Sequence, residues 1–424
     1  MYDTGSTAFM IVCTMLVLLM TPGLAFFYGG LSRRKNVVNT MIMVMGVIGV
    51  VGVLWIVCGW SFAYGGDGSL PFFGGFDQMG CLTATSVMLA DTAIVPEGDT
   101  YPAIINIGFQ MAFCMITCAI VTGSVAGRMK FGAVIAFIAA WSIIVYAPLA
   151  HMVWGGEGSL IGDTIGALDF AGGDVVHISS GVTGLVLCIL LGGRRGFGVM
   201  SYRAHNVPFV ALGAALLWFG WFGFNAGSQF AADGTAALAL LNTVAASAAG
   251  MAAWLVVEGI RVGKPTLVGA CTGLVAGLVA ITPGAGFVEP WAAIVIGAIV
   301  SPCCYLAISW AKRRFGYDDA LDAFGCHSVG GIIGGLLTGI FCVPELSWTD
   351  FGGLLYTGDF SLLGSQFLGI LVTLAFVIVL DLVIGFVVKA LFRGKLRVAE
   401  QDEMRGLDIA THGESAYPAY LGMD

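Results

Sequence analysis

Every Lys and Arg residue of this chain lies in one of a few short stretches, which long apolar segments separate. Most of these segments are long enough for two membrane passes, because about 20 apolar residues span the hydrocarbon layer. Cytoplasmic loops of membrane proteins collect positive charge. The pattern therefore predicts a polytopic membrane protein whose chain returns to the cytoplasm after every second span. The eighteen basic residues are Arg33, Arg34, Lys35, Arg128, Lys130, Arg194, Arg195, Arg203, Arg261, Lys264, Lys312, Arg313, Arg314, Lys389, Arg393, Lys395, Arg397 and Arg405.

We expect an all-α protein with eleven transmembrane helices, the N-terminus outside the cell and the C-terminus in the cytoplasm. The loops after even-numbered spans contain no Lys or Arg, whereas each loop after an odd-numbered span contains at least two. No basic residue precedes the first span, so no cleaved leader is expected. The predicted spans are residues 7–31, 39–64, 101–124, 131–153, 173–192, 207–230, 236–259, 266–283, 290–311, 321–342 and 364–390.

The composition agrees with this class and disfavours several functions. Charged residues make up 10% of the chain and hydrophobic residues 58%, whereas a soluble domain has about 25% charged residues. The basic residues form no patch outside the predicted inner loops, which argues against nucleic-acid binding. Most of the eleven Cys lie in predicted spans and none forms a C-x-x-C pattern, so we expect no external disulfide and no cysteine metal site. No cofactor motif appears, and we expect no cofactor. No nucleophile and base occur in a pattern typical of an enzyme.

An internal repeat places a histidine in two corresponding spans. Residues 172–185 read GGDVVHISSGVTGL and residues 322–336 read DAFGCHSVGGIIGGL, so both contain H-x3-G-x2-G around His177 and His327. Each segment is the fifth span of a five-span half, and an odd number of spans gives the two halves opposite orientations. This is the inverted-repeat architecture, which puts a shared site near the middle of the membrane. Glycines on the histidine face would let the two helices approach closely.

The paired histidines have a functional and a structural interpretation. Ionisable groups inside spans are rare and tend to be functional, but a histidine can also hold helices together by bonding a carbonyl. Two symmetry-related histidines beside glycine faces favour the functional interpretation. Neutral imidazole offers one donor and one acceptor, so the pair suits a small neutral solute or a proton relay. A two-histidine metal site is disfavoured because no further ligand has a matching position.

Seven long segments resemble the ammonium transporter / Rh glycoprotein superfamily, on the branch of microbial and plant ammonium transporters. The likeness covers essentially the whole chain. It implies a transmembrane domain over residues 1–390, with halves of about 1–200 and 201–345 and an eleventh helix at 364–390, and a cytoplasmic regulatory tail over 391–424. The segments are GLAFFYGGL (23–31), HMVWGG (151–156), ALDFAGGDVVHI (167–178), WFGFNAGS (221–228), KPTLVGACTGLVAGLVAITP (264–283), DDALDAFGCH (318–327) and RGLDIATHGESAY (405–417).

The resemblance implies a homotrimer with a pore through each subunit and assigns roles to individual residues. Phe113, Trp154 and Ser228 match an outer site that recruits ammonium. Phe113 and Phe224 match a phenyl gate below it, and the two histidines match the pore lining. Among the carboxylates, Asp169 and Asp322 match supporting positions at the outer and inner ends of the pore. Asp318 and Asp319 lie close in sequence to Arg313 and Arg314, and we expect local ion pairs there.

The expected function is ammonium transport across the cell membrane. Ammonium would bind at the outer aromatic site and lose its proton near the gate, and ammonia would then cross past the histidines, with or without a separate proton. The tail resembles a segment that contacts a cytoplasmic PII signalling protein. An ammonium sensor that acts through PII is the alternative, and an Rh-like channel for ammonia or carbon dioxide is a third interpretation. Trp154 and Ser228 disfavour the third, because Rh-type members typically lack them.

Overall fold

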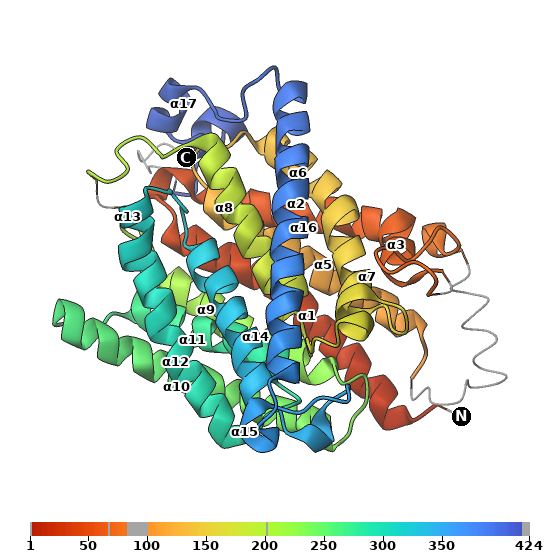
Figure 1. Ribbon diagram of the computed structural model, residues 1–424. Helices are drawn as coiled ribbons and strands as arrows, with labels where there is room; N and C mark the ends of the chain where they lie inside the picture. The colour runs from red at the N-terminus through yellow and green to blue at the C-terminus, as the bar shows by residue number, and fades with distance from the viewer. Residues whose placement is uncertain (1, 67, 83–100, 201, 418–424) are drawn as a thin grey trace.

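The computed structural model shows tilted helices packed side by side between two ends of the molecule (Figure 1). It describes residues 2–66, 68–82, 101–200 and 202–417. Within these ranges eleven helices are long and apolar enough to cross a membrane, as predicted. These spans are Thr4–Leu31, Arg34–Tyr64, Ile104–Val125, Phe131–Trp154, Gly173–Leu191, Val207–Gly227, Gly234–Val262, Leu267–Gly284, Pro290–Phe315, Phe324–Phe341 and Ser361–Leu391.

Five of the spans combine an α-helix with a π-helical turn, which widens the helix locally. These turns are η2 (Trp55–Gly59), η4 (Ser142–Tyr146), η6 (Gly173–Ile178), η8 (Ala307–Ala311) and η9 (Phe324–Ser328). The α-helices are α1 (Thr4–Leu31), α2 (Val37–Leu54), α3 (Trp60–Tyr64), α5 (Ile104–Val125), α6 (Phe131–Trp141), α7 (Ala147–Trp154), α8 (Ser179–Leu191), α9 (Val207–Gly227), α10 (Gly234–Val262), α11 (Leu267–Ile281), α12 (Pro290–Leu306), α13 (Lys312–Phe315), α14 (Val329–Phe341), α15 (Leu354–Thr357), α16 (Ser361–Leu391) and α17 (Glu400–Arg405).

Two pairs of corresponding helices in the two halves pack against each other. The first helices of the two halves, α1 and α9, pack closely at glycines. A Cβ atom added at Gly213 would come within 2.2 Å of Phe27 N, and one added at Gly30 would come within 2.6 Å of Val210 N. The fifth spans, which contain η6 and η9, also meet at the histidines. Paired contacts between equivalent helices are what an inverted repeat with a two-fold axis produces.

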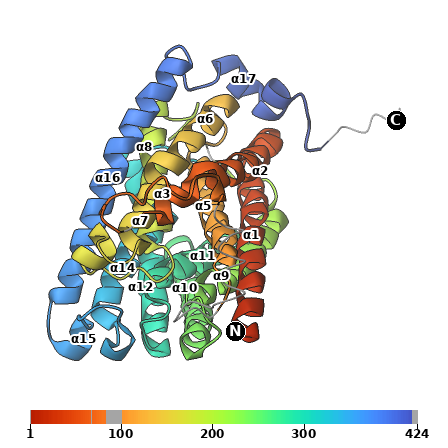
Figure 2. The ribbon, with the colours of Figure 1, turned by 90° about the vertical axis from the view of Figure 1, so that its right-hand side faces the viewer.

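The two ends of the molecule differ in charge. The N-terminus and α15 lie at the end opposite α17 (Figures 1 and 2). Among the loops that carry Lys and Arg, those of Lys130 and Arg195 contact α17 or the segment leading to it. Lys130 N donates to Leu396 O over 2.9 Å, and Arg195 Nη1 donates to Glu400 Oε1 over 2.6 Å. We call this end the basic end.

The tail folds back on the basic end as far as it is described. Glu403 is buried, and its carboxylate accepts hydrogen bonds from Arg397 Nη2 over 2.7 Å and from the backbone N of Arg195 over 2.9 Å. Beyond α17, Asp408 accepts from the backbone N of Asn39 over 2.9 Å at the start of α2. Residues 418–424 of the predicted tail lie outside the described residues. The described tail is therefore docked rather than freely solvated.

Candidate functional site

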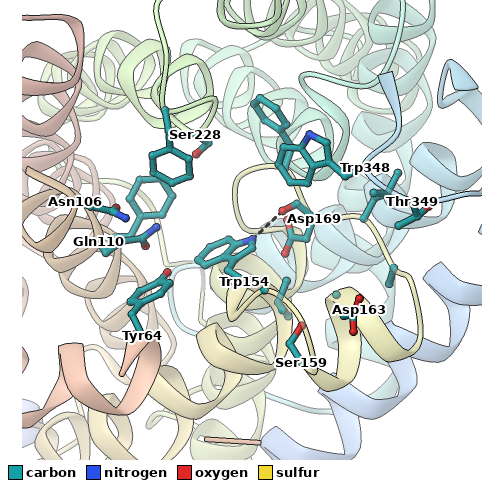
Figure 3. Close-up of a pocket in the computed structure, with 18 residues that line it drawn as sticks. Tyr64, Asn106, Gln110, Trp154, Ser159, Asp163, Asp169, Ser228, Trp348 and Thr349 are labelled. Atoms are coloured by element: carbon teal, nitrogen blue, oxygen red, sulfur yellow. Dashed lines mark hydrogen bonds between the residues drawn. The ribbon is translucent and has the colours of Figure 1, made fainter. Parts of the chain in front are cut away.

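A cavity of about 390 Å³, here called the vestibule, lies at the end of the molecule opposite the basic end. Phe113 of α5, Trp154 at the end of α7 and Ser228 directly after α9 all line it. Figure 3 shows Trp154 and Ser228 among the lining residues. Asp163 and Asp169 are its charged lining residues in the described chain, and no Lys or Arg lines it there. The structure thus brings the three predicted recruitment residues together in an acidic, aromatic cavity.

Hydrogen bonds orient the side chains of the vestibule. Trp154 Nε1 donates to the carbonyl of Asp169 over 2.8 Å (Figure 3), and the indole meets Phe113 edge-on, with the planes at 84°. Ser228 Oγ donates to the carbonyl of Phe224 over 2.9 Å. Because that bond uses the hydroxyl proton, the oxygen lone pairs remain free to accept from a solute N–H. An aromatic face beside such an acceptor suits a small cation with N–H donors.

Two stacked phenyl rings close the vestibule toward the interior. The rings of Phe113 and Phe224 are 4.0 Å apart between centroids and 12° from parallel. Both side chains are buried, at 1% and 0% exposure. A solute that leaves the vestibule along this path has to displace at least one ring, as in the predicted gate.

The two histidines lie beyond the phenyl pair and share a hydrogen bond. The Nδ1 atoms of His177 and His327 are 3.2 Å apart, so one ring donates and the other accepts. The ring of His177 lies 6.1 Å from that of Phe224 and stacks on Trp221 at 5.3 Å. Its Nε2 atom is buried and has no hydrogen-bond partner in the part of the chain that the structure describes. The pair therefore offers an unused polar atom inside an otherwise apolar passage.

Only two of the four predicted glycines lie between the two histidine segments. A Cβ atom on Gly181 would come within 2.5 Å of Ser328 N, and one on Gly331 within 3.3 Å of His177 Cβ. These two glycines therefore let the histidine segments meet, as predicted. Gly184 and Gly334 face other helices instead, with Ser124 and Ala280 as their nearest neighbours.

Three cavities lie in series. The stacked rings of Phe113 and Phe224 separate the first from the second, and the second and third share Phe27, Val275 and His327 as lining residues. Beyond the vestibule, a cavity of about 10 Å³ is lined by Phe224 and both histidines, and a third of about 150 Å³ is lined by His327 and Asp322. The series forms a narrow path between the two ends of the protein, with histidine nitrogens as the polar atoms of its middle part. The other residues around the middle cavity are Met20, Leu24, Phe27, Ile116, Ile120, Val176, Leu217, Trp221 and Val275.

Asp169 is a structural cap rather than a free vestibule carboxylate. Its two oxygens accept from the backbone N atoms of four residues at the start of η6, over 2.6–3.3 Å. Asp319 does the same for η9, accepting from the backbone N atoms of Ala323, Phe324 and Gly325. Each aspartate lies eight residues before its histidine, so aligning the repeats on the histidines would have identified Asp319. We named Asp322 from the sequence as the supporting carboxylate at the inner end and did not identify Asp319 as a cap.

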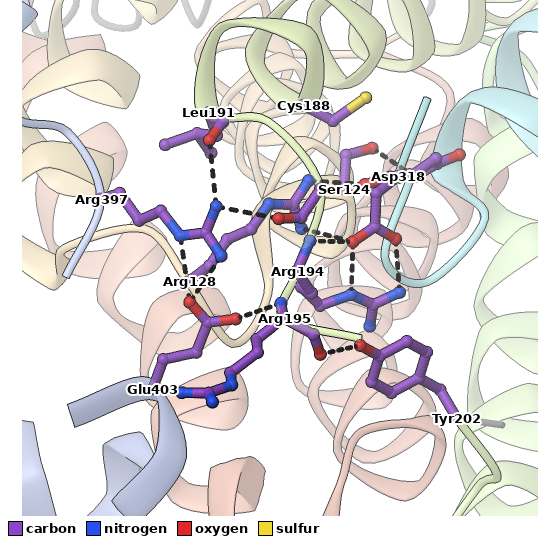
Figure 4. A network of polar contacts seen from close by, with 12 residues as sticks. Ser124, Arg128, Cys188, Leu191, Arg194, Arg195, Tyr202, Asp318, Arg397 and Glu403 are labelled. Carbon is purple, nitrogen blue, oxygen red and sulfur yellow. Dashed lines mark hydrogen bonds and ion pairs between the residues drawn. The ribbon is translucent and has the colours of Figure 1, made fainter. Parts of the chain in front are cut away.

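The predicted ion pairs of Asp318 and Asp319 with Arg313 and Arg314 are wrong. Asp318 instead binds Arg194, whose Nε and Nη2 atoms donate to its two oxygens over 2.8 and 2.7 Å (Figure 4). Both side chains are buried. Sequence proximity misled the prediction, because the chain turns back into the bundle at Asp319 and leaves the two arginines exposed.

Asp322 pairs with Lys312 over 2.8 Å and has a positive φ of 63°. It lines the third cavity, near the predicted inner end of the pore. Burial raises the pKa of its carboxyl, and the nearby Lys312 opposes that rise.

Two tryptophans at the site were not singled out from the sequence. Trp221 supports His177, and its Nε1 donates to Thr282 Oγ1 over 3.0 Å. Its position three residues before Phe224 puts both on one helix face, which was a usable signal. Trp348 lines the vestibule across from Gln110 (Figure 3) and packs on Phe287. It comes from the loop after α14, and no pattern linked it to the site.

Comparison with known proteins agrees with this geometry. The profile of the Ammonium Transporter Family matches residues 8–417. The chain belongs to the ammonium transporter family. It is 48% identical to an ammonium transporter of Aquifex aeolicus, covering 98% of this chain and 94% of that protein, and 46% identical to one of Bacillus subtilis, covering 97% and 98%.

Solved structures of the family have the same fold. Mep2 of Saccharomyces cerevisiae matches with a TM-score of 0.84 and 33% identity, over 94% of this chain and 88% of that chain. A protein described as a sensor Amt protein matches with a TM-score of 0.86 and 28% identity, over 96% and 98%. This family member is thus a multi-pass membrane transporter of ammonium rather than an enzyme.

Proposed function

We propose that ammonium is recruited in the vestibule by Phe113, Trp154 and Ser228. The observation that carries this proposal is the meeting of two aromatic side chains and a hydroxyl acceptor in a cavity whose charged residues are acidic. A cation–π contact contributes about 0.5–2 kcal/mol. A hydrogen bond to a charged donor adds about 1.5–3 kcal/mol. The acidic wall raises the local concentration of cations.

The solute crosses the middle of the pore as ammonia. Removing an ion from water costs several kcal/mol even after relaxation, and the wall around the 10 Å³ cavity is apolar apart from the histidines. Potassium has nearly the size of ammonium but cannot lose a charge. A passage that admits only a deprotonated solute therefore excludes potassium by its charge, whatever the ion's diameter. Ammonium gives up its proton near Phe113 and Phe224, where desolvation begins.

His177 and His327 then guide ammonia by hydrogen bonding. The unused Nε2 of His177 is available to a neutral amine, and the Nδ1 contact links the two rings. The same contact is a step for a proton that travels separately. Net transport is electrogenic if the proton uses this route, and electrically neutral if it returns to the vestibule.

The chain is oriented with its basic end in the cytoplasm of the cell, because positive charge is retained there. Each subunit of a homotrimer carries its own pore, and the docked tail offers a surface to a cytoplasmic PII protein. These three statements rest on the charge pattern and on the family resemblance.

An ammonium sensor that signals through PII is the second candidate. It is favoured by the likeness to the sensor Amt protein and by the docking of the tail beside several loops of the basic end. The two candidates differ in flux, since a sensor binds ammonium without moving much of it.

The test is ammonium uptake by proteoliposomes that contain the full chain, followed with an internal pH dye. Ser228→Ala removes the hydroxyl acceptor and Trp154→Leu removes the indole. We expect each to raise the half-saturating ammonium concentration about tenfold. Trp291→Leu is the matched control, because Trp291 is 45% exposed and does not line the vestibule. Unchanged half-saturation in both vestibule variants would argue against this recruitment site.

A further inference from the structure

A separate cavity of about 530 Å³ lies at the basic end, between the loop after α1 and the tail. It shares no lining residue with the three cavities of the pore path. We call it the tail pocket. Its lining residues are Arg33, Arg34 and Lys35 from the loop, and Arg405, Asp408, Ile409, Ser415 and Tyr417 from the tail.

The charges that line the tail pocket do not balance. Four side chains are cationic and one, Asp408, is acidic. Oδ1 of the Asp408 carboxylate accepts a hydrogen bond from the backbone N of Asn39 at the start of α2, and Oδ2 is buried without a hydrogen-bond partner in the described chain. Burial also raises the pKa of this carboxyl, against that hydrogen bond. None of the four cations forms an ion pair with a carboxylate of the described chain. The pocket therefore keeps an excess of positive charge.

Arg33 and Arg34 each lie over an aromatic ring, which leaves the N–H groups of their guanidinium groups available for hydrogen bonds. The guanidinium of Arg33 lies 5.3 Å from the ring centre of Tyr202, and that of Arg34 lies 5.6 Å from Tyr417. Stacking on a ring face leaves the donors in the guanidinium plane available. Nη2 of Arg33 is buried and has no hydrogen-bond partner among the described residues. A buried charged donor without an acceptor is costly, and an anion in the pocket would satisfy it.

The two walls of the pocket are held together by specific contacts. Leu407 N donates to Asn36 Oδ1 over 2.9 Å, and Lys35 Nζ donates to the carbonyl of Met404. Gly406 has a φ of 104°, and a Cβ atom there would come within 2.6 Å of Lys35. Only glycine permits this close crossing. The pocket is therefore a built cleft between two docked segments.

Tyr417 closes the tail side of the cleft. Its hydroxyl lies 3.0 Å from His205 Nε2 and 3.1 Å from Asn206 Nδ2, in the segment that begins the second half. A ligand in the pocket would thus touch a loop of the first half and a tail segment anchored to the second.

We propose that the tail pocket binds a phosphate group and that the bound phosphate holds the tail against the loop after α1. Arginine forks match phosphate oxygens in pairs, and an excess of several positive charges favours a multiply charged anion over a carboxylate. The group belongs either to an anionic phospholipid of the adjacent leaflet or to a soluble phosphorylated molecule.

The experiment measures pyrophosphate binding to the full chain in nanodiscs by isothermal titration calorimetry. In neutral phosphatidylcholine nanodiscs we expect saturable binding of one pyrophosphate per chain. The double variant Arg34→Gln/Arg405→Gln should weaken it at least tenfold. The matched control is Arg313→Gln/Arg314→Gln, which removes the same charge from exposed positions of α13 that do not line the pocket. We expect wild-type binding in this control.

Phosphatidylglycerol nanodiscs distinguish the two sources. Loss of pyrophosphate binding there, with wild-type binding in phosphatidylcholine, means that a lipid headgroup occupies the pocket. Equal binding in both lipids means that the ligand is soluble. A second readout is tryptic cleavage after Arg405 in the wild-type chain, which pyrophosphate should slow. The proposal is overturned if no saturable binding occurs in phosphatidylcholine, or if both double variants weaken binding equally.

Discussion

At the residue scale, a few side chains line the pore path, and some of their hydrogen-bonding groups are already bonded within the protein. The hydroxyl of Ser228 and the indole of Trp154 both donate to carbonyls of the protein, so their free faces are an oxygen lone pair and an aromatic ring. Both attract a cation. The histidine pair offers nitrogen atoms in an apolar wall, which suits a neutral amine. The change from one kind of surface to the other occurs at the stacked phenyl rings.

Replacing His177 with a negatively charged residue tests whether the passage excludes cations because it is apolar. In His177→Asp the carboxylate stabilises a cation inside the passage, so we expect potassium to become permeant while ammonium still crosses. The measurement is the potassium-evoked current on proteoliposomes, compared with the wild type. His177→Asn is the control, because it adds polarity without charge and should keep potassium excluded. Potassium exclusion unaltered in His177→Asp would count against the pore assignment.

At the scale of elements, each histidine turn depends on an aspartate cap, and each cap is joined to a neighbouring helix or loop. Asp319 accepts from the start of η9 and from Ser124 Oγ of α5 over 2.7 Å. The adjacent Asp318 is clamped by Arg194 and lies 4.0 Å from the fully buried Arg128. The loop 318–322 thus ties the second histidine turn to the loops of the first half.

Acidic pH should weaken the ion pair between Asp318 and Arg194. Burial alone would raise the pKa of Asp318, but the hydrogen bonds and charge of Arg194 outweigh it and hold the pKa below its usual value. An unfolded aspartate titrates at about 3.9. The stabilisation is therefore fully present above that pH and is lost as the pH falls through the lower folded pKa. We expect Asp318→Asn to cost about 3 kcal/mol or more at pH 7, and the deficit to shrink below about pH 4.

Thermal unfolding in detergent, followed by tryptophan fluorescence, measures this deficit. A difference between wild type and Asp318→Asn that stays constant from pH 7 to pH 3 would exclude the charge as its origin.

The tail is the second element whose docking can be tested. Glu403 is 2% exposed and bonds both Arg397 and the backbone of Arg195, so Glu403→Gln should release the tail and speed tryptic cleavage after Arg405 severalfold. Glu400→Gln is the matched control. The Glu400 side chain is 71% exposed and that of its partner Arg195 is 52% exposed, and such surface ion pairs contribute about 0–1 kcal/mol. Equal cleavage rates in the two variants would mean that the tail is not held through Glu403. Mass spectrometry of the released peptides gives the rates.

The sequence predicted the spans and the histidine pair because both rest on local regularities. Apolar length and loop charge mark the spans, and the repeated H-x3-G-x2-G pattern marks the pair. The partners of Asp318 and the contribution of Trp348 depend on loops that meet only after folding. Arg313 and Arg314 were the nearer charges in sequence, yet Arg194, 124 residues away, is the partner. Nothing local distinguishes such a contact.

At the scale of the whole molecule, the proposed recruitment site, the histidine passage and the docked tail follow one another along one axis. The acidic vestibule lies at one end, the apolar histidine passage in the middle and the docked tail at the basic end. The inverted halves build the passage from equivalent turns, η6 and η9, each capped by an aspartate. Because the tail contacts loops of the basic end, a ligand or partner that moves it can act on the inner end of the pore.

The most direct test of the account is a pulse of ammonium, and separately of potassium, on proteoliposomes fitted with an electrode and an internal pH dye. The account predicts a saturable response to ammonium and none to potassium. A current would show that the proton crosses by its own route, and internal alkalinisation without current would show that ammonia moves alone. A potassium current of similar size, or no response to ammonium at all, would contradict transport through a deprotonating, histidine-lined pore.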